Sequence, residues 1–220
     1  MTSDTGTAPA RRAPRPRADA LRNRERIVTA AREMFVEFGA QVPYDEIARR
    51  AGVGNATLYR NFPERDDLVR EVVLSLLARV TELAERAAAE EDDTFAALRR
   101  FVHGAADERV GALCPMLDGG FDKDHPDLVA ERERLEEAVQ GLVDRAQRAG
   151  RLRTDVGVGD LMVAVSQLTR PLPGTACAAF APFVRRHLQV FLDGLEAPAR
   201  SELPGAAVTL EDLRRDSCPS

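Results

Sequence analysis

The chain has 220 residues, of which 44% are hydrophobic and 30% are charged, a mixture typical of a globular protein with one large or two small domains. No apolar run approaches the roughly 20 residues that a membrane span requires, and the N-terminus has no apolar signal region, so we expect neither a membrane protein nor a signal peptide. The three cysteines, Cys114, Cys177 and Cys218, lie far apart without metal-ligand spacing, which predicts a reducing cytoplasm and no zinc site.

The net charge of −5 is distributed unevenly along the chain. Residues 11–62 hold 11 Arg and six acidic residues, a surplus of five positive charges that leaves −10 on the remainder. A basic N-terminal segment on an acidic body is the charge layout of a protein that binds a polyanion such as DNA. The alternative is that these Arg residues lie on ordinary solvated helix faces, and charge alone does not decide between the two.

The N-terminal 38 residues predict an arm followed by a helix. Residues 1–18 are rich in Thr, Ala, Pro and Arg and lack apolar periodicity, which predicts a disordered basic arm. The arm could lie along a DNA backbone or in a minor groove, or it could be a solubilising tail. From Asp19 to Phe38, apolar residues recur at three- and four-residue steps, and Gly39 is a suitable helix end.

Two short helices are predicted next, joined by the tight turn A-G-V-G. The first begins at Pro43 and ends at Gly52, and the second covers residues 55–62 before Pro63. Two short helices behind a longer supporting helix form the layout of a helix-turn-helix unit. Leu58 and Phe62 are four residues apart, and they would bury one face of the second short helix against Ile27, Phe35 and Ile47.

The rest of the chain predicts further helices at about 65–89, around 95–102, and at about 127–149, 158–170 and 178–195. Residues 104–126 predict an irregular segment. No stretch alternates with the period of a strand, so the predicted fold is all-α. We divide it into the arm at 1–18, a helix-turn-helix domain at 19–64, a larger helical domain at 65–196, and a flexible C-terminal tail at 197–220. The roles of DNA binding for the first domain and of ligand binding and dimerisation for the second are implied by the resemblance described next.

The stretches RERIVTAAREMFVEFG and DEIARRAGVGNATLYRNFPERDDLVREV resemble the DNA-binding domain of TetR-type transcriptional regulators over about residues 20–75. The later stretches RAQRAGRLRTDVGVGDL and HLQVFLDGL are similar to the C-terminal domain of an actinobacterial-type subset. The resemblance implies a homodimer that binds a double-stranded operator through its helix-turn-helix, and a small-molecule effector that releases it.

The resemblance also implies roles for individual residues of the helix-turn-helix. Asn55 and Thr57 would lie at or near base edges, since Asn suits adenine and the Thr methyl suits thymine. Tyr59, Asn61 and Arg65 would bind phosphates, and the predicted DNA-binding set is completed by Arg60 and Tyr44. The alternative for Tyr59 is a half-buried ring between helices, and both roles can coexist because Tyr has a polar tip.

The sequence departs from the family pattern at four positions. Pro43 stands where a hydroxyl residue usually caps the second helix, so a phosphate contact there is in doubt. Gly54 replaces a common Ser, and Ala56 replaces a frequent Gly. Asn61 replaces a frequent His but can still donate to a phosphate. Base selection is therefore predicted to depend more narrowly on Asn55 and Thr57.

An effector cavity is predicted in the second domain. Its candidate residues, most of which would be core in any helical bundle, are Phe95, Leu98, Phe101, Val102, His103, Met116, Leu117, Phe121, Met162 and Gln167. The helices at 158–170 and 178–195 are predicted to pack against their symmetry mates as a four-helix dimer interface, with apolar area from Leu161, Val165, Leu168, Phe183, Leu188 and Phe191.

No catalytic or metal-binding pattern is evident. Asp122, Asp124 and His125, with Asp127 and Glu131, form an oxygen-rich segment, but their spacing is not that of an EF-hand, and a solvated acidic loop is the preferred interpretation. No nucleophile–His–acid order or phosphate loop appears, so we expect no enzyme, no metal and no cofactor. The predicted function is a ligand-responsive repressor, and the alternative is an activator or a metal- or redox-sensing regulator of the same fold. Cys114 could be an exposed redox thiol, but a buried structural thiol is the preferred interpretation.

Overall fold

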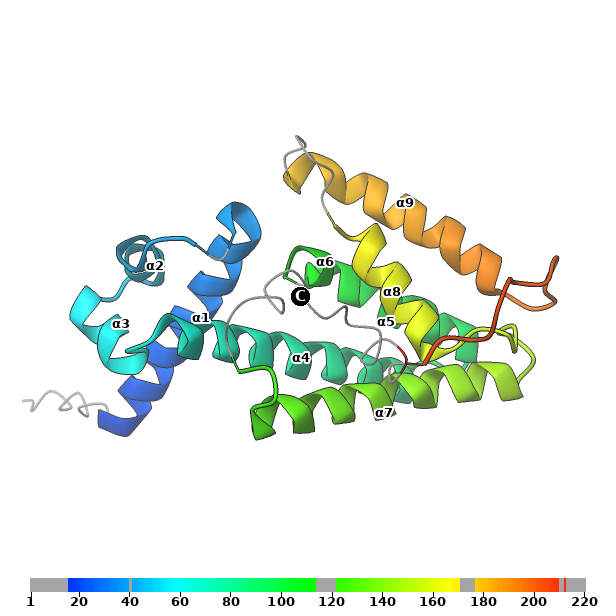
Figure 1. The fold of residues 1–220 in the computed structure, drawn as a ribbon, viewed down its shortest axis with the longest axis horizontal. Helices are drawn as coiled ribbons and strands as arrows, with labels where there is room; N and C mark the ends of the chain where they lie inside the picture. Colours follow the sequence, from blue (N-terminus) through cyan, green and yellow to red (C-terminus); the bar gives the residue numbers. More distant parts are fainter. Residues whose placement is uncertain (1–15, 40, 114–121, 171–176, 210–211, 213–220) are drawn as a thin grey trace, which may run out of the picture.

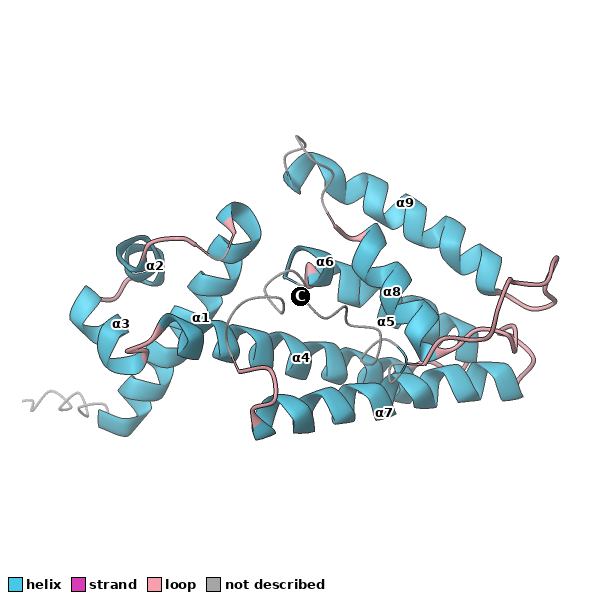
Figure 2. Ribbon diagram, in the orientation of Figure 1, coloured by secondary structure: helices cyan, strands magenta, loops and turns pink. Residues whose placement is uncertain are grey.

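In this computed structural model, residues 16–39, 41–113, 122–170, 177–209 and 212 are described. Over these ranges the chain forms nine helices and no strand (Figures 1 and 2), which confirms the predicted all-α fold. The helices are α1 (Pro16–Phe38), α2 (Tyr44–Ala51), α3 (Asn55–Asn61), α4 (Arg65–Glu90), α5 (Thr94–Asp107), α6 (Val110–Leu113), α7 (Pro126–Arg148), α8 (Val158–Leu168) and α9 (Cys177–Leu195). Within the described part of the chain, no helix is both long and apolar enough to cross a membrane.

The molecule has two parts that share one helix (Figure 1). The first part, which we call the head, consists of α1, α2, α3 and the beginning of α4. The second part, which we call the body, consists of the rest of α4 and α5 to α9. Helix α4 runs out of the head and lies along α7, its main partner in the body.

The core of the head is built from the residues that the periodicity predicts. Leu58 and Phe62 are fully buried, and the other members of the predicted set, Ile27, Phe35 and Ile47, are at most 2% exposed. Phe38, which also fits the periodicity of α1, is instead 66% exposed, because the helix ends there at Gly39, which has a φ of 82°. The head therefore has a small hydrophobic core of its own, and α3 packs against it through Leu58.

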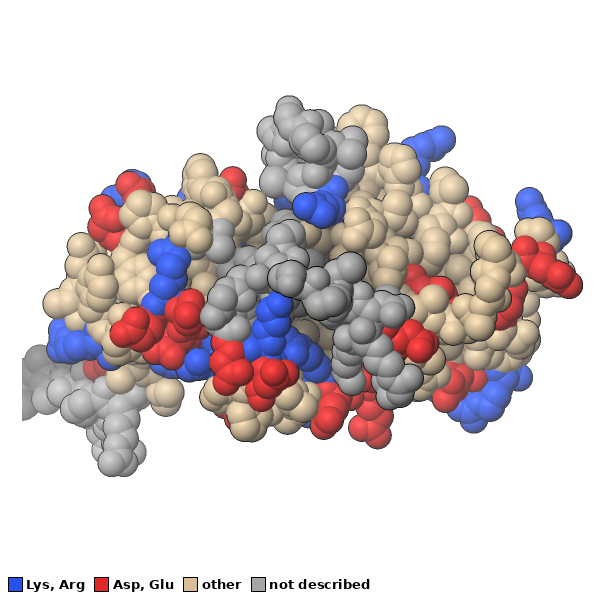
Figure 3. All heavy atoms as spheres, viewed as in Figure 1, with Lys and Arg blue, Asp and Glu red and all other residues tan. Residues whose placement is uncertain are grey.

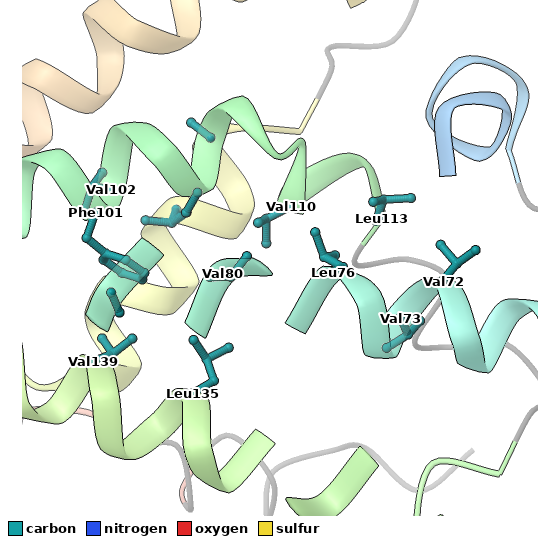
Figure 4. Packing of buried hydrophobic residues seen from close by; sticks show 14 of the residues in the cluster. Val72, Val73, Leu76, Val80, Phe101, Val102, Val110, Leu113, Leu135 and Val139 are labelled. Atoms are coloured by element: carbon teal, nitrogen blue, oxygen red, sulfur yellow. The ribbon is translucent and has the colours of Figure 1, made fainter. Parts of the chain in front are cut away.

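The core of the body lies where α4, α5, α6 and α7 meet (Figure 4). Leu76 and Val80 of α4 face Leu135 and Val139 of α7, and Phe101 and Val102 of α5 close the core on the opposite side. All of these side chains are less than 9% exposed. Burial of apolar surface on this scale is the main favourable contribution to folding.

Helix α6 is a single turn inside the segment that the sequence predicts to be irregular. Gly111 brings it against the C-terminal end of α8, where the backbone N–H of Gly111 donates to Thr169 Oγ1 at 2.9 Å. A Cβ at Gly111 would lie 2.4 Å from that oxygen and 2.5 Å from the carbonyl oxygen of Ser166. The residue at this position must therefore be glycine for the two helices to approach this closely.

The chain after α9 returns across the connector between α7 and α8. Leu152 forms an antiparallel bridge with Glu196, and the guanidinium of the buried Arg153 donates to the carbonyl oxygen of Ser201 at 2.7 Å. Farther on, the Gly159 N–H donates to the carbonyl oxygen of Val208 at 2.9 Å. The predicted flexible tail at 197–220 thus makes specific contacts over residues 197–209, and most of the remainder lies outside the described residues.

Arg153 is also paired within the connector. Its Nε and Nη2 atoms donate to the two carboxylate oxygens of Asp155 at 2.6 and 2.8 Å. The hydrogen bonds from Arg153 are the main reason that the pKa of Asp155 is lowered to about 2. Asp155 therefore stays ionised, and keeps its pairing with Arg153, farther into the acidic range than an ordinary aspartate would.

We predict that Gly111→Ala destabilises the protein by about 1 to 3 kcal/mol, since the added methyl must push α6 away from α8. The matched control is Gly141→Ala on the exposed surface of α7, where an added Cβ meets nothing within 4 Å. That control should be neutral or stabilising by up to about 1 kcal/mol, because Ala is the better helix former. Urea denaturation at one protein concentration measures both, and equal effects of the two substitutions would contradict the assigned packing.

Candidate nucleic-acid interface

The turn between α2 and α3 is set by two glycines. Gly52 ends α2 with a φ of 64°, a left-handed conformation that side chains disfavour, and its N–H bonds to the last carbonyl groups of α2. The N–H of Val53 donates to the carbonyl oxygen of Ala48 at 3.0 Å. Gly54 then precedes α3 in an extended conformation without a side-chain cap. This geometry turns α3 away from α2 and presents one of its faces to solvent.

The outward face of α3 carries the side chains that the sequence analysis selects. Asn55, Tyr59 and Arg60 are exposed, and Thr57 and Asn61 are partly buried, while Leu58 is fully buried. Ala56 is also exposed, and a Cβ at Gly54 would meet nothing within 4 Å. The first turn of α3 is therefore a surface of small side chains that another molecule can approach closely.

Two of the predicted contact residues fold back onto α3. Arg60 donates from Nε to the carbonyl oxygen of Ala56 at 2.9 Å, and Asn61 donates from Nδ2 to the carbonyl oxygen of Thr57 at 2.7 Å. Part of their hydrogen-bonding capacity is therefore used within the helix. This leaves Asn55 as the exposed amide at the start of the helix.

Tyr44 and Tyr59 form one aromatic pair across α2 and α3. Their ring centroids are 5.1 Å apart at an interplanar angle of 51°, and the Tyr44 hydroxyl donates to the carbonyl oxygen of Glu64 at 2.9 Å. Burial raises the pKa of Tyr44, and the positive charge of Arg65 opposes this in part. Tyr59 remains 54% exposed, so the pair fixes one face of its ring and leaves its other side accessible.

Arg65, at the start of α4, contacts residues of the head. Its Nη2 atom donates to the carbonyl oxygen of Val42 at 2.6 Å, and its guanidinium lies 5.7 Å from the Tyr44 ring centre and 6.0 Å from that of Phe35. In this arrangement Arg65 holds the start of α4 to the segment before α2. This bond uses only one of the N–H donors of the guanidinium, so the phosphate contact of Arg65 stays a prediction.

Two other arginines, which the sequence analysis does not single out, position α3. The guanidinium of Arg24 lies 4.4 Å from the centre of the Phe62 ring and donates to Glu71 at 2.6 Å. Arg26 donates to the carbonyl oxygen of Gly52 at 2.9 Å. These contacts join residues 26 to 47 positions apart, so no local pattern in the sequence reveals them.

The residues predicted to line the effector cavity differ in their burial. Phe95, Leu98, Phe101 and Val102 are buried, Met162 and His103 are partly buried, and Gln167 is exposed, while Met116, Leu117 and Phe121 lie outside the described residues. The Nδ1 atom of His103 is buried without a hydrogen-bond partner in the described structure. Two open hollows of about 540 and 580 Å³ lie elsewhere, between α1 and α2 and between the α7–α8 connector and the chain after α9. Gln167 therefore lies on the surface of the described chain, and its role as a polar anchor for an effector stays a prediction.

Of the residues predicted for the dimer interface on α8 and α9, some are buried within their own chain and others are exposed. Leu161, Val165 and Leu188 are at most 1% exposed within their own chain, so they cannot supply an outer face. Leu168 and Phe191 pack partly against the core, whereas Phe183 is 56% exposed. Val163 and Val190, which the sequence analysis does not select, are 41% and 64% exposed. In the view of Figure 3, the surface over α8 and α9 is mostly uncharged.

The acidic segment before α7 has the solvated character that the sequence analysis prefers. Asp122 and Asp124 are exposed, and His125 caps α7 by accepting the Asp127 N–H at 3.3 Å. Within the described ranges, no group of three or more His, Cys, Asp or Glu side chains is arranged to hold a metal ion. Cys114 lies outside those ranges.

Comparisons with known proteins agree with this geometry. The family model described as "Bacterial regulatory proteins, tetR family" matches residues 27–72, and the one described as "Transcriptional regulator SbtR-like, C-terminal domain" matches residues 93–197. A TetR transcription regulatory protein of Mycobacterium vanbaalenii is similar in structure, with a TM-score of 0.62 and 32% identity over 82% of this chain and 99% of that one. A TetR transcriptional regulator of Streptomyces coelicolor gives a TM-score of 0.61 and 29% identity over 80% of this chain and 99% of that one.

Curated relatives match shorter stretches. An HTH-type transcriptional regulator of Staphylococcus aureus is 40% identical over 58 residues, which is 26% of this chain and 31% of the relative. The nucleoid occlusion factor SlmA of Vibrio campbellii is 28% identical over 132 residues, which is 56% of this chain and 62% of the relative. The chain thus covers less than two thirds of the length of either relative.

We predict that Arg65→Ala lowers the stability of the head by about 1 to 3 kcal/mol, because it leaves the Val42 carbonyl without its charged donor. Arg60→Ala is the control, since Arg60 is exposed and bonds within its own helix. Thermal unfolding and amide hydrogen exchange of α2 and α3 measure the two variants. Equal protection of α2 in Arg65→Ala and in Arg60→Ala would show that the Arg65 contacts do not hold the head together.

Proposed function

Since this chain belongs to the TetR family of transcriptional regulators, we propose that it is a cytoplasmic repressor that binds a pseudo-palindromic operator as a homodimer and leaves it when a small molecule binds the body. The observation that carries the proposal is the outward face of α3. It combines Asn55, Ala56 and Thr57 at the start of a helix that two glycines turn away from its neighbour. A second helix of a helix-turn-helix unit enters the major groove with its N-terminal residues against base edges.

The roles that we propose for the residues of α3 follow from their positions along the helix and from the contacts within the head. Asn55 and Thr57 stand first on α3, where base edges are reached, and Asn can bond adenine while the Thr methyl contacts thymine. Tyr59 and Asn61 lie farther along the helix, where side chains position the duplex through its phosphates. The Tyr44–Tyr59 ring pair supports this by fixing the Tyr59 ring relative to α2.

The proposed dimer interface is the outer face of α8 and α9. Phe183 and Val190 of α9 and Val163 of α8 are large apolar side chains left exposed by the fold. Exposed large apolar side chains on a surface that is mostly uncharged in the view of Figure 3 are typical of an interface between copies of one chain. Two heads held by such a two-fold contact would meet two half-sites of a symmetric operator.

We predict that the protein binds a fragment of the DNA upstream of its own gene, and that its affinity falls about tenfold or more between 50 and 200 mM salt. The physical reason is that each phosphate neutralised by a basic side chain releases condensed counterions. Fluorescence anisotropy with a labelled fragment measures this slope. Binding that is independent of salt, or no binding to any upstream fragment, would refute the proposal.

In the same assay, Thr57→Ala should keep the salt slope and reduce the preference for the operator over unrelated DNA by about 1 to 3 kcal/mol, the amount that one base contact contributes. Thr29→Ala is the matched control, because Thr29 is an exposed threonine on α1, away from the outer face of α3. If both variants prefer the operator over unrelated DNA as strongly as the wild type does, Thr57 does not contribute to sequence recognition.

The dimer interface has a separate prediction. Val190→Asp should shift the protein from dimer to monomer by at least about tenfold in dissociation constant, because it buries an unpaired carboxylate between the two copies. Val129→Asp on α7 is the control, since Val129 is an exposed valine of the body outside α8 and α9. Sedimentation equilibrium measures both variants, and a monomeric wild type or an unaffected Val190→Asp dimer would exclude this interface.

A further inference from the structure

The turn between α5 and α6 joins the head to the body through Glu108. Arg32 of α1 donates from Nη1 to Glu108 Oε2 at 2.6 Å, which links the head to this turn. Arg79 of α4 donates from Nε to the same oxygen at 2.8 Å and from Nη2 to Oε1 at 2.7 Å. One carboxylate therefore holds a guanidinium of the head and a guanidinium of the body at the same time.

This cluster is shielded from solvent more than an ordinary surface ion pair. The Glu108 and Arg32 side chains are 16% and 20% exposed. Burial on its own would raise the pKa of Glu108, but the hydrogen bonds and charges of Arg79 and Arg32 outweigh it and lower the pKa. Arg79 is 49% exposed, but Glu108 and Arg32 would both remain largely buried without their partner if they separated, so their pairing resists separation.

The backbone of the turn is held in place on both sides. Arg109 has a φ of 61°, a conformation that residues other than glycine rarely adopt and that the surrounding structure must hold. Its N–H donates to the carbonyl oxygen of Ala106 at 3.0 Å, and its carbonyl oxygen accepts the N–H of Leu113 at 3.3 Å. The turn is thus a fixed corner, and Glu108 has little freedom to follow a moving head.

The same corner is anchored to α8. The Gly111 N–H donates to Thr169 Oγ1, and this hydroxyl donates in turn to the carbonyl oxygen of Val165 at 2.7 Å. Thr169 is 5% exposed, so the contact is inside the body. A continuous set of contacts therefore leads from Arg32 in the head, through Glu108 and α6, to the helix that carries Val163.

We propose that Glu108 is a positioning residue that sets the spacing of the two half-sites the dimer accepts, by locking the head through Arg32 at one angle to α8. This inference rests on the proposed dimeric binding of DNA. The separation of the two α3 helices depends on the angle of each head to the dimer interface, and two half-sites are bound together only when that separation matches theirs. A head released from Glu108 would reach a wider range of separations.

The test uses full-length protein and duplexes that the wild type itself selects from a random library. The selected site is rebuilt with its spacer lengthened or shortened by one and two base pairs, and a duplex with a single half-site is included. We expect Glu108→Gln and Arg32→Gln to reduce the preference for the best spacing over the two-base-pair variants by about fivefold or more, the lower end of typical coupling between sites. Affinity for the single half-site should stay unchanged.

Arg134→Gln is the matched control, because Arg134 pairs with Glu131 and Glu85 on the surface of the body and has no contact with the α5–α6 turn in the described structure. It should keep the spacing profile of the wild type. If Glu108→Gln does not fold, Arg32→Gln carries the test, since it leaves the two Arg79–Glu108 bonds in place.

The outcomes separate the inference from the function on which it rests. Variants that bind half-sites and keep the wild-type spacing profile would overturn the role of Glu108 while leaving DNA binding intact. An equal loss of affinity at every spacing and at the single half-site would also overturn it, because Glu108 would then only stabilise the fold. A wild type that selects no duplex would refute the proposed function and the spacing role together.

Discussion

Helix α4 is the element on which both parts of the molecule depend. It spans 26 residues, or about 39 Å at 1.5 Å per residue, without an interruption. Its first turns pack on α1 and close the head, and its later turns pack on α5 and α7 in the body. Because an unbroken helix is stiff, any change in the body that tilts α4 must move the head as well. The two parts are therefore joined by a continuous helix rather than by a flexible linker.

Helix α4 alone does not fix the angle of the head relative to the side of the body. Contacts outside α4 are needed for that. The ion pair between Arg24 and Glu71 ties α1 to α4, but both of its ends lie at the head. The Arg32–Glu108 pair is different, because its acidic end belongs to a turn that packs on α8. Head orientation is thus set by a partly buried ion pair, an interaction whose loss is costly, while the head core itself is closed by apolar contacts that do not depend on it.

The fold of the head could be predicted from the sequence because its signals are local. Gly39, Gly52 and Pro63 mark helix ends within one or two residues of where the structure has them, and the apolar spacing identifies Leu58 as the buried residue of α3. The outward register of α3 follows from the same spacing. Contacts across the head could not be predicted in this way. Arg65 sits where the family pattern suggests a phosphate contact, but its partner Val42 lies 23 positions away, and only the folded head brings them together.

The body shows why helix positions are easier to predict than helix faces. The expected helices at 158–170 and 178–195 exist, yet the apolar side chains chosen for their outer face, Leu161, Val165 and Leu188, are buried inside. Both helices are apolar on more than one side, so periodicity cannot say which side meets the core and which meets a second copy. Helix α6 is a harder case, because four residues carry no periodicity and its place depends on Thr169, 58 positions away. Since Thr169 caps the helix that carries the exposed Val163, α8 contacts the α6 turn at its C-terminal end and exposes an apolar side chain where we propose that a second copy binds.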